Sequence, residues 1–255
     1  MIAYIDSLGC KLNQSECDEW KRSLSCSGWR ITEDCRIADV IVLNTCSVTH
    51  IAARKSRQMV RRYARLNPGA SIVVTGCYAE LRPEAVAQLP GARLVLGMKE
   101  KDGLPDILTK ELSCATANRC DTRPTALTRR TRAFVKVQDG CDNECAYCIV
   151  RIARGHHRSR SLQSVLDDVC AREAEGHQEV VLTGVHIGAY GRERGLSLAD
   201  LVRTVLSGTH FPRLRLSSIE PWDATPELLS LWENPRLCRH LHLPLQSGCS
   251  ATLNA

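Results

Sequence analysis

The chain has 255 residues, of which 44% are hydrophobic, so it is long enough to bury two separate cores. It contains 14 cysteines, but its first residues, MIAYIDSLGC, lack the basic flank and apolar stretch of an export signal. No apolar run approaches the ~18 residues of a membrane span. These features disfavour secretion and membrane insertion, and they predict a cytoplasmic protein whose thiols serve metal or redox chemistry.

The formal net charge of +6 comes in three basic clusters, at residues 54–65, 129–132 and 151–160. Separated basic patches suit a polyanion such as RNA, through contacts to its phosphates. A solvated helix face explains each single cluster equally well.

In the N-terminal half, short apolar runs alternate with amphipathic stretches, which is typical of a parallel sheet covered by crossover helices. The expected strands are Ile2–Asp6, Val40–Asn44, Ser71–Thr75 and Arg93–Leu96, and the expected helices are Gln14–Cys26, Thr49–Leu66, Pro83–Leu89 and Leu104–Ser113. On the second helix, Arg54, Arg57, Arg61 and Arg65 form one stripe, which should face outward. The sequence thus predicts a first α/β domain at residues 1–118.

Residues 119–131 lack apolar periodicity and predict a linker, followed by a second domain at residues 132–255. Its expected strands are Ala133–Val137, Glu179–Thr183, Arg213–Ser217 and His240–Leu243, and its expected helices are Leu162–Glu175, Leu198–Leu206 and Pro226–Trp232. Ser161 is the expected N-cap of the first of these helices, and Gly176 its C′ residue. No closing helix follows the fourth strand, so we expect this domain to be truncated at its C-terminus.

Cys141, Cys145 and Cys148 form a C-x3-C-x2-C motif just after a predicted strand. Three soft thiolates suit one iron–sulfur cluster and leave one iron without a protein ligand, which makes a reactive site. The alternative is a zinc knuckle with His156 or His157 as fourth ligand.

Cys10, Cys46 and Cys77 each lie at or near the carboxyl end of a predicted parallel strand. Such ends form one edge of an open α/β sheet, where ligands gather. Buried structural thiols are the alternative. No role is assigned to the remaining cysteines, which are Cys17, Cys26, Cys35, Cys114, Cys120, Cys170, Cys238 and Cys249.

The segments AFVKVQDG and CDNECAYC resemble the cluster motif of the radical S-adenosylmethionine superfamily. SLGCKLNQSE, NTCSVTHIAARKSRQ and TGCYAE resemble the methylthiotransferases of that superfamily. RKSRQ, together with QDGC and ARGHHRSR, is most similar to the branch that modifies N6-threonylcarbamoyladenosine in tRNA. The resemblance extends over residues 1 to 250.

This resemblance implies an open parallel sheet with flanking helices, followed by a partial β/α barrel. It implies two [4Fe-4S] clusters, one at Cys10, Cys46 and Cys77 and one at Cys141, Cys145 and Cys148, with S-adenosylmethionine bound at the second. The implied cofactor-lining residues are Thr183, Gly184, Ser218, Glu220 and Gln246. His186 and Tyr190, in the same glycine-rich loop, could also line the pocket, but a surface position is the simpler expectation for such a histidine.

The implied activity is transfer of a methylthio group to C2 of N6-threonylcarbamoyladenosine beside the anticodon, with no catalytic residue assigned beyond the cluster ligands. The implied partners are a tRNA anticodon stem-loop and an electron donor such as a flavodoxin or ferredoxin. The alternatives are a methylthiotransferase for a ribosomal protein or another modified adenosine, and a non-catalytic, metal-stapled RNA-binding module. Two departures stand out: Arg151 replaces an expected proline, and the family continues through further barrel strands and a small RNA-binding domain.

Overall fold

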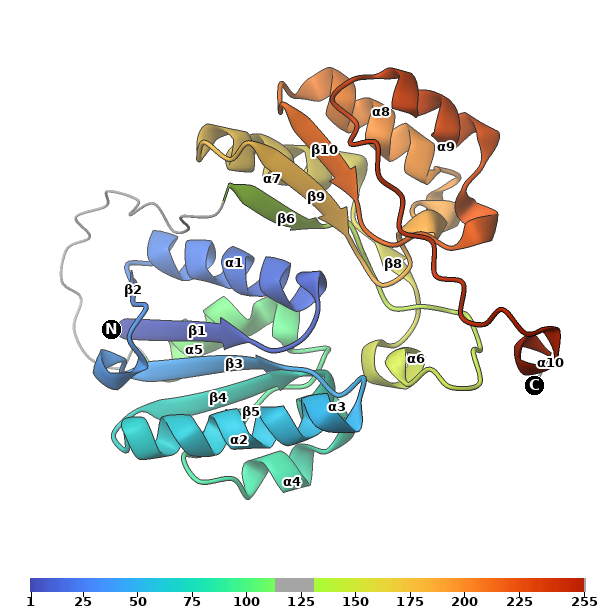
Figure 1. The fold of residues 1–255 in the computed structure, drawn as a ribbon. Helices are drawn as coiled ribbons and strands as arrows, with labels where there is room; N and C mark the ends of the chain where they lie inside the picture. Colours follow the sequence, from blue (N-terminus) through green and yellow to red (C-terminus); the bar gives the residue numbers. More distant parts are fainter. Residues whose placement is uncertain (113–130, 255) are drawn as a thin grey trace. The chain divides into compact units, whose positions relative to one another are not determined.

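The computed structural model describes residues 1–112 and 131–254, and its contacts divide the chain into two compact units (Figure 1). The first unit comprises Met1–Arg129 and Asn143–Gly155, and the second comprises Arg130–Asp142 and His156–Ala255. Residues 143–155, which the sequence assigned to the second domain, thus group with the first unit. The predicted linker lies outside the described residues except for Thr131.

The first unit contains a five-stranded, wholly parallel sheet in the order β2-β1-β3-β4-β5. The strands are β1 (Ile2–Ser7), β2 (Arg30–Ile31), β3 (Val40–Thr45), β4 (Ser71–Gly76) and β5 (Ala92–Val95). The predicted parallel sheet is therefore confirmed. The sequence missed β2, because two residues are too short to show an apolar pattern.

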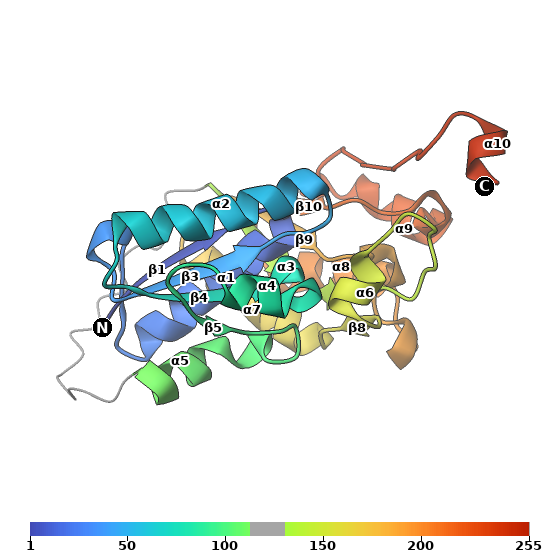
Figure 2. The same cartoon turned by 90° about the horizontal axis from the view of Figure 1, so that it is seen from below.

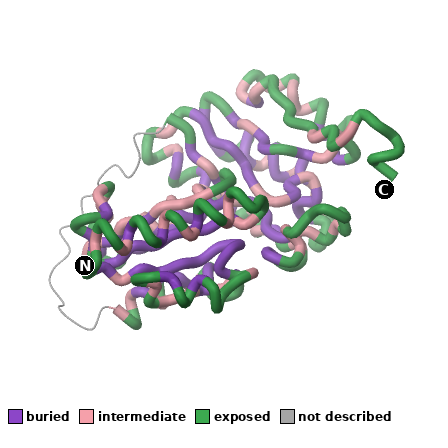
Figure 3. The backbone as a smooth tube through the Cα atoms, turned by 60° about the horizontal axis from the view of Figure 1, so that its bottom comes forward, coloured by how far each residue is buried: buried purple, intermediate pink, exposed green. Residues whose placement is uncertain are grey.

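Helices cover both faces of this sheet (Figures 1 and 2). The helices of this unit are α1 (Lys11–Cys26), α2 (His50–Leu66), α3 (Cys77–Leu81), α4 (Pro83–Ala87), α5 (Leu104–Leu112) and α6 (Val150–Arg154), of which α6 packs against α3. Alternate residues of β3 point to opposite faces, so Val40 and Val42 pack with α1 and α5, whereas Ile41 and Leu43 pack with α2, α3 and α4. The burial colours of Figure 3 show strands that are mostly buried beneath helices with exposed outer sides.

The second unit contains a parallel three-stranded sheet in the order β10-β9-β6, formed by β6 (Arg132–Lys136), β9 (Glu179–Thr183) and β10 (Arg213–Leu216). Its core brings these strands together with α7 (Leu162–Ala174), α8 (Leu198–Gly208) and α9 (Pro226–Ser230). A short antiparallel pair, β7 (Gln138–Asp139) and β8 (Arg158–Ser159), follows β6. Ser161 caps α7 by accepting from the Ser164 N–H, and Gly176 has φ +85° just after the helix, which confirms both expected caps.

One predicted strand is wrong. His240–Leu243 is irregular, and the only pairing beyond β10 in the described residues is an isolated bridge between Leu214 and Leu237. The alternation HLHL imitates a strand, but Leu241 and Leu243 are exposed. The expected helix at Pro226–Trp232 also ends early, at Ser230, where a 3-10 turn begins.

The remaining regular elements are short. One helix, α10, spans Ser250–Leu253, and 3-10 turns occur at Cys35–Ile37, Lys101–Gly103, Ile187–Ala189, Arg192–Arg194, Pro221–Asp223 and Leu231–Glu233. Among the helices of the described ranges, none has the length and apolar character needed to cross a membrane.

Candidate metal centres

Cys10, Cys46 and Cys77 lie at the carboxyl ends of three neighbouring strands of the first unit. Cys10 follows β1, Cys46 follows β3, and Cys77 is the first residue of α3, directly after β4. Between β1 and β3 the strand order changes direction, and in open α/β sheets ligands bind at such a switch point. The fold therefore brings together three thiols that are far apart in the sequence.

Two glycines allow these loops to approach one another. Gly9 has φ +102°, and a Cβ there would lie 2.7 Å from the Cβ of Cys46. Gly76 has φ +93°, and a Cβ there would lie 2.4 Å from the Thr45 carbonyl oxygen. Both conformations favour glycine, and both close contacts exclude a side chain. The cysteine-bearing loops thus depend on glycine at positions 9 and 76.

The environment of these thiols suits a bound metal cluster. Burial raises the pKa of the Cys46 thiol. The nearby Cys77 and Cys10 thiols also raise it, whereas the Arg154 guanidinium opposes the rise. Coordination to a cation would deprotonate the thiols and offset the repulsion among them. An all-sulfur donor set is the one that iron–sulfur clusters use. Cys10 is exposed, so inert core packing does not explain it.

Within residues 1–112 and 131–254, no three His, Cys, Asp or Glu side chains are arranged to hold a single metal ion. The case for a cluster at Cys10, Cys46 and Cys77 therefore rests on their sulfur chemistry and on their shared place at the strand ends.

A buried polar network underlies Cys10 and Cys46, and its centre is Glu16 on α1. Arg154 on α6 donates to Asn13 Oδ1 at 2.6 Å and to Glu16 Oε1 at 3.3 Å. Lys101 forms an ion pair with Glu16, and Asn44 donates to Glu16 Oε2 at 2.9 Å. The Glu16, Lys101 and Arg154 side chains are at most 3% exposed. We name these five residues the Glu16 network.

The Glu16 network connects the segment that carries Cys145 and Cys148 to the loops that carry Cys10 and Cys46. Arg154 lies six residues after Cys148, on α6, which packs against α3 within the first unit. Asn13 in turn donates to the carbonyls of Leu8, at 2.7 Å, and of Thr45, at 3.1 Å. One network therefore holds backbone next to both cysteines.

Sequence reasoning missed this network and counted Arg154 as part of a surface basic cluster. A signal for it was present on α1, where Leu12, Glu16, Trp20 and Leu24 form one buried stripe. A carboxylate within an apolar stripe requires a buried partner.

Cys145 and Cys148 belong to the first unit and are exposed, and the Cys148 N–H donates to the Cys145 carbonyl at 3.0 Å. Arg151, which stands where the resemblance leads us to expect proline, forms an ion pair with Glu144. The hydrogen bond from Arg151 holds the pKa of Glu144 below its usual value. This replacement thus adds a cation that is paired across the loop.

Cys141 belongs to the second unit, where its Sγ lies 4.0 Å from His186 Nδ1. His186 Nε2 bonds to Asp223 Oδ2 at 2.7 Å, and Arg192 donates to Asp223 Oδ1 at 2.7 Å. The expected surface position of His186 is wrong: the residue is 6% exposed. Tyr190 is also buried, and its hydroxyl donates to the Arg160 carbonyl at 2.7 Å.

The glycine-rich loop after β9 is fixed by Gln138. Its Oε1 accepts from the N–H groups of Val185, at 3.0 Å, and His186, at 2.8 Å, while its Nε2 donates to the Gly140 carbonyl at 2.6 Å. A Cβ on Gly184 would lie 2.8 Å from the Gln138 carbonyl oxygen. The loop is therefore held tightly against the segment that leads into Cys141.

The predicted cofactor-lining residues fall into two groups. Thr183 ends β9 and Gly184 follows it, while Ser218 and Glu220 follow the adjacent β10, so these four share the carboxyl edge of one sheet. Ser218 Oγ lies 2.7 Å from His242 Nδ1. Gln246 lies in the irregular segment, exposed and with φ +63°. Its place in the cofactor site stays a prediction.

The contacts of His157 count against its role as the fourth ligand of a zinc ion. Its Nδ1 lies 2.9 Å from Gln138 Nε2 and its Nε2 lies 3.0 Å from Glu193, so both ring nitrogens are engaged. His156 Nδ1 lies 2.8 Å from Asp142, and this hydrogen bond lowers the pKa of Asp142.

Comparisons with known proteins agree with these motifs. Residues 2–97 match the profile of a family described as "Uncharacterized protein family UPF0004". Over 98% of its length the chain is 35% identical to the threonylcarbamoyladenosine tRNA methylthiotransferase MtaB of Thermotoga maritima, of which it covers 59%. It is 33% identical to a tRNA-2-methylthio-N(6)-dimethylallyladenosine synthase of Geobacter sulfurreducens, over 98% of the chain and 60% of that protein. The chain thus spans about three fifths of the length of these relatives.

Among solved structures, the fold is similar to that of the radical S-adenosylmethionine methyltransferase TsrM from Kitasatospora setae. The TM-score is 0.65 at 14% sequence identity, over 99% of this chain and 60% of that one. At this identity the likeness concerns the fold alone.

Proposed function

Because its motifs resemble those of the radical S-adenosylmethionine methylthiotransferases and its curated relatives are named as tRNA methylthiotransferases, we propose that the chain belongs to that family and functions as a tRNA methylthiotransferase. The observation that carries this proposal is the presence of two separate three-cysteine sets. Cys10, Cys46 and Cys77 lie at neighbouring strand ends, and Cys141, Cys145 and Cys148 form a C-x3-C-x2-C motif. Each set suits one [4Fe-4S] cluster.

The proposed substrate is N6-threonylcarbamoyladenosine beside the anticodon, modified at C2. Relatives named for this substrate are 34–36% identical to the chain, and relatives named for the dimethylallyl substrate are 31–33% identical. The second substrate is therefore the nearest alternative. A ribosomal protein is less well supported, because α2 carries six Lys and Arg residues and no acidic residue, which suits a polyanion better than a protein side chain.

Two [4Fe-4S] clusters and S-adenosylmethionine would supply one-electron cleavage of a carbon–sulfur bond and a methylated sulfur for transfer. In this proposal the six cysteines hold the clusters, and Thr183, Gly184, Ser218, Glu220 and Gln246 line the cofactor site. Gln138 fixes the glycine-rich loop, so its backbone is preorganised before any ligand binds. An electron donor such as a flavodoxin or ferredoxin, and a cytoplasmic location, remain part of the proposal.

Two cysteine variants separate the roles of the two sets. Cys145→Ala should abolish cleavage of S-adenosylmethionine under reducing conditions. Cys10→Ala should retain that cleavage but transfer no methylthio group to tRNA from a strain that lacks the modification. Cys26→Ala, an exposed cysteine at the end of α1, is the matched control and should behave like the wild type. The measurements are chromatography of the cleaved cofactor and mass spectrometry of tRNA nucleosides.

The outcomes distinguish the candidate functions. Full cleavage in Cys145→Ala would contradict the assignment of the C-x3-C-x2-C motif. If the wild type cleaves S-adenosylmethionine but places the methylthio group on a ribosomal protein and not on tRNA, the ribosomal-protein substrate is favoured. No cleavage in any protein, with metal bound, would favour a non-catalytic RNA-binding module.

A further inference from the structure

Helix α2 carries six cations and no acidic residue over residues 50–66. The cations are Arg54, Lys55, Arg57, Arg61, Arg62 and Arg65. Six equals the formal net charge of the whole chain, so the rest of the sequence is neutral overall. The excess positive charge of this protein is therefore carried by one helix.

The outer side of α2 presents these charges to solvent. Ser56, Val60 and Tyr63 are buried and hold the helix on the sheet. Five of its cations are exposed, and in the described ranges no ion pair joins them to a carboxylate: they are Arg54, Lys55, Arg61, Arg62 and Arg65. The sixth, Arg57, lies over the Tyr78 ring and donates to its hydroxyl at 3.1 Å.

The other two basic clusters differ from α2. Arg132 pairs with Glu179, and Arg160 pairs with Asp168. Arg151 and Arg154 pair with Glu144 and Glu16. Among the described residues of these two clusters, Arg132, Arg151, Arg154 and Arg160 are thus each paired with a carboxylate, in contrast to the exposed cations of α2.

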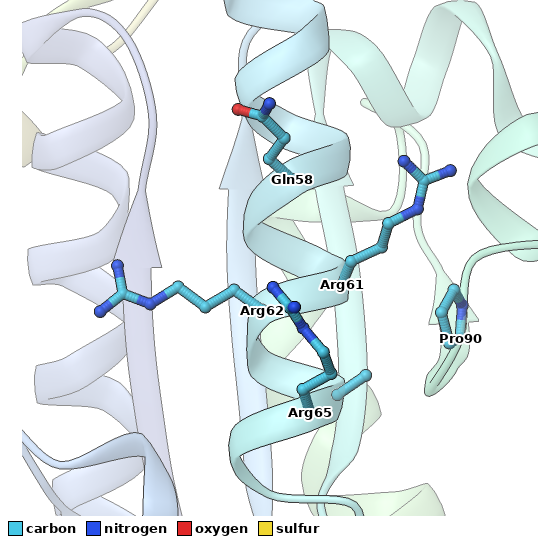
Figure 4. Close-up of a pocket in the computed structure, with 6 residues that line it drawn as sticks. Gln58, Arg61, Arg62, Arg65 and Pro90 are labelled. Carbon is cyan, nitrogen blue, oxygen red and sulfur yellow. The ribbon is translucent and has the colours of Figure 1, made fainter.

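A pocket of about 620 Å³ lies beside the C-terminal half of α2 (Figure 4). Its lining consists of Gln58, Arg61, Arg62, Ala64, Arg65 and Pro90. Figure 4 shows Arg61 and Arg62 extending to opposite sides of the helix, with Arg65 one turn beyond Arg61. Guanidinium groups bind phosphate oxygens in a bidentate manner, so a pocket rich in arginine suits a backbone phosphate.

The direction of α2 relates this pocket to the candidate metal centre. The helix begins four residues after Cys46 and, with 17 residues, runs away from the cysteine edge of the sheet. At 1.5 Å per residue it is about 25 Å long, which places Arg61 and Arg65 about 16–22 Å along it. Near its start, Val48 and Ile51 are exposed and apolar, which suits unpaired bases, whereas the far end is cationic.

We propose that the outer side of α2 binds the sugar–phosphate backbone of the substrate RNA's stem, with a stem phosphate in the pocket at Arg61 and Arg65. This inference rests on the proposed tRNA substrate. The reacting base must reach Cys10, Cys46 and Cys77, and the phosphates that lie 16–22 Å away along α2 then belong to the stem rather than to the loop. The helix would set the orientation of the RNA without reading its sequence.

The test is a charge-reversal pair with a matched control. The pocket variant combines Arg61→Glu with Arg65→Glu. The control variant combines Arg30→Glu on β2 with Lys110→Glu on α5, which changes the net charge by the same amount away from α2. Binding of a fluorescent anticodon stem-loop is measured by anisotropy over a range of salt concentrations. We expect the pocket variant to bind about tenfold more weakly or worse and to lower the slope of log K against log salt by about 2, while the control changes little.

Removing the stem from the RNA completes a double-mutant cycle. If the stem docks on the pocket, stem removal weakens binding to the wild type but has little further effect on the pocket variant. The inference would be overturned if stem removal and the pocket substitutions weakened RNA binding additively. It would also be overturned if the pocket variant and the control variant lost the same affinity.

Two controls separate this inference from the proposed function. Cleavage of S-adenosylmethionine without RNA should be the same in the pocket variant and the wild type. A wild type that does not bind the stem-loop at all would overturn both the docking surface and the tRNA substrate. A pocket variant that binds and modifies the stem-loop like the wild type would overturn the docking surface alone.

Discussion

Glu16 is a buried carboxylate that faces two buried cations, Lys101 and Arg154. Removing these charges from water is costly, and mutual attraction offsets that cost only while each group keeps its partners. Burial raises the pKa of Cys46, and the Arg154 guanidinium opposes that rise without reversing it. The Glu16 network therefore stabilises the fold beneath Cys46 and reduces the cost of its thiolate form.

The two ends of this network should respond differently to mutation. Glu16→Gln removes the buried carboxylate that Lys101 and Arg154 share and should cost about 3–5 kcal/mol of unfolding free energy. Arg154→Met should cost less, because Lys101 still neutralises Glu16, but it should release α6 and raise proteolysis within residues 143–155. Urea unfolding and limited proteolysis measure these effects, with Arg36→Ala, which breaks an exposed pair with Asp34, as control. A larger loss of stability for Arg154→Met than for Glu16→Gln would contradict this account.

Glu179, at the start of β9, accepts from Arg215 at 2.7 Å and from Arg213 at 3.1 Å, and Arg132 lies 2.9 Å away. Burial alone would raise the pKa of Glu179, but these three cations outweigh burial and lower it. A carboxyl whose pKa is lower in the folded state contributes stability above its unfolded pKa, and that contribution is lost as the pH falls through its folded pKa.

Stability measured against pH tests this effect. Glu179→Gln should be clearly less stable than the wild type at pH 7, and the difference should shrink as the pH falls below about 4. Thermal unfolding at several pH values measures it. A difference that stays constant down to acid pH would show that the charge of Glu179 is not responsible.

At the scale of elements, the strands and long helices could be predicted because each carries its own apolar pattern. The basic side of α2 and the caps of α7 followed from residue spacing alone. The failures occurred where structure depends on a partner. His240–Leu243 has a strand-like alternation but pairs with no strand among the described residues, and α3 and α6 are too short to show a helical period.

The glycine-rich loop illustrates an element held by contacts that only the fold reveals. A Cβ on Gly188 would lie 2.2 Å from Asp223 Oδ2, so Asp223 would have to move away from His186 and Arg192. Gly188→Ala should therefore cost about 1–3 kcal/mol of stability and weaken binding of S-adenosylmethionine.

Calorimetry and thermal unfolding check this expectation. Gly103→Ala is the control, because no atom lies within 4 Å of a Cβ placed there. Unchanged cofactor affinity in Gly188→Ala would show that the Asp223 contacts do not shape the cofactor site.

At the scale of the whole molecule, the six cysteines proposed as cluster ligands could be singled out by their spacing, by predicted strand ends and by the resemblance to a known family, and their role stays a prediction. The residues that support them could not be singled out in this way. Arg154 and Glu16 are 138 residues apart, and nothing local pairs them. The surface position expected for His186 failed for a related reason, since its partner Asp223 comes 37 residues later.

The central claim is that this chain holds two iron–sulfur clusters on two separate cysteine sets. The most direct test is to reconstitute the protein anaerobically and to count iron and sulfide per chain in the wild type and in two triple variants. One variant changes Cys141, Cys145 and Cys148 to Ala, and the other changes Cys10, Cys46 and Cys77 to Ala. We predict about eight irons in the wild type and about four in each variant, since each cluster contains four irons. About four irons in the wild type, and none after loss of Cys141, Cys145 and Cys148, would contradict the claim by showing that Cys10, Cys46 and Cys77 hold no cluster.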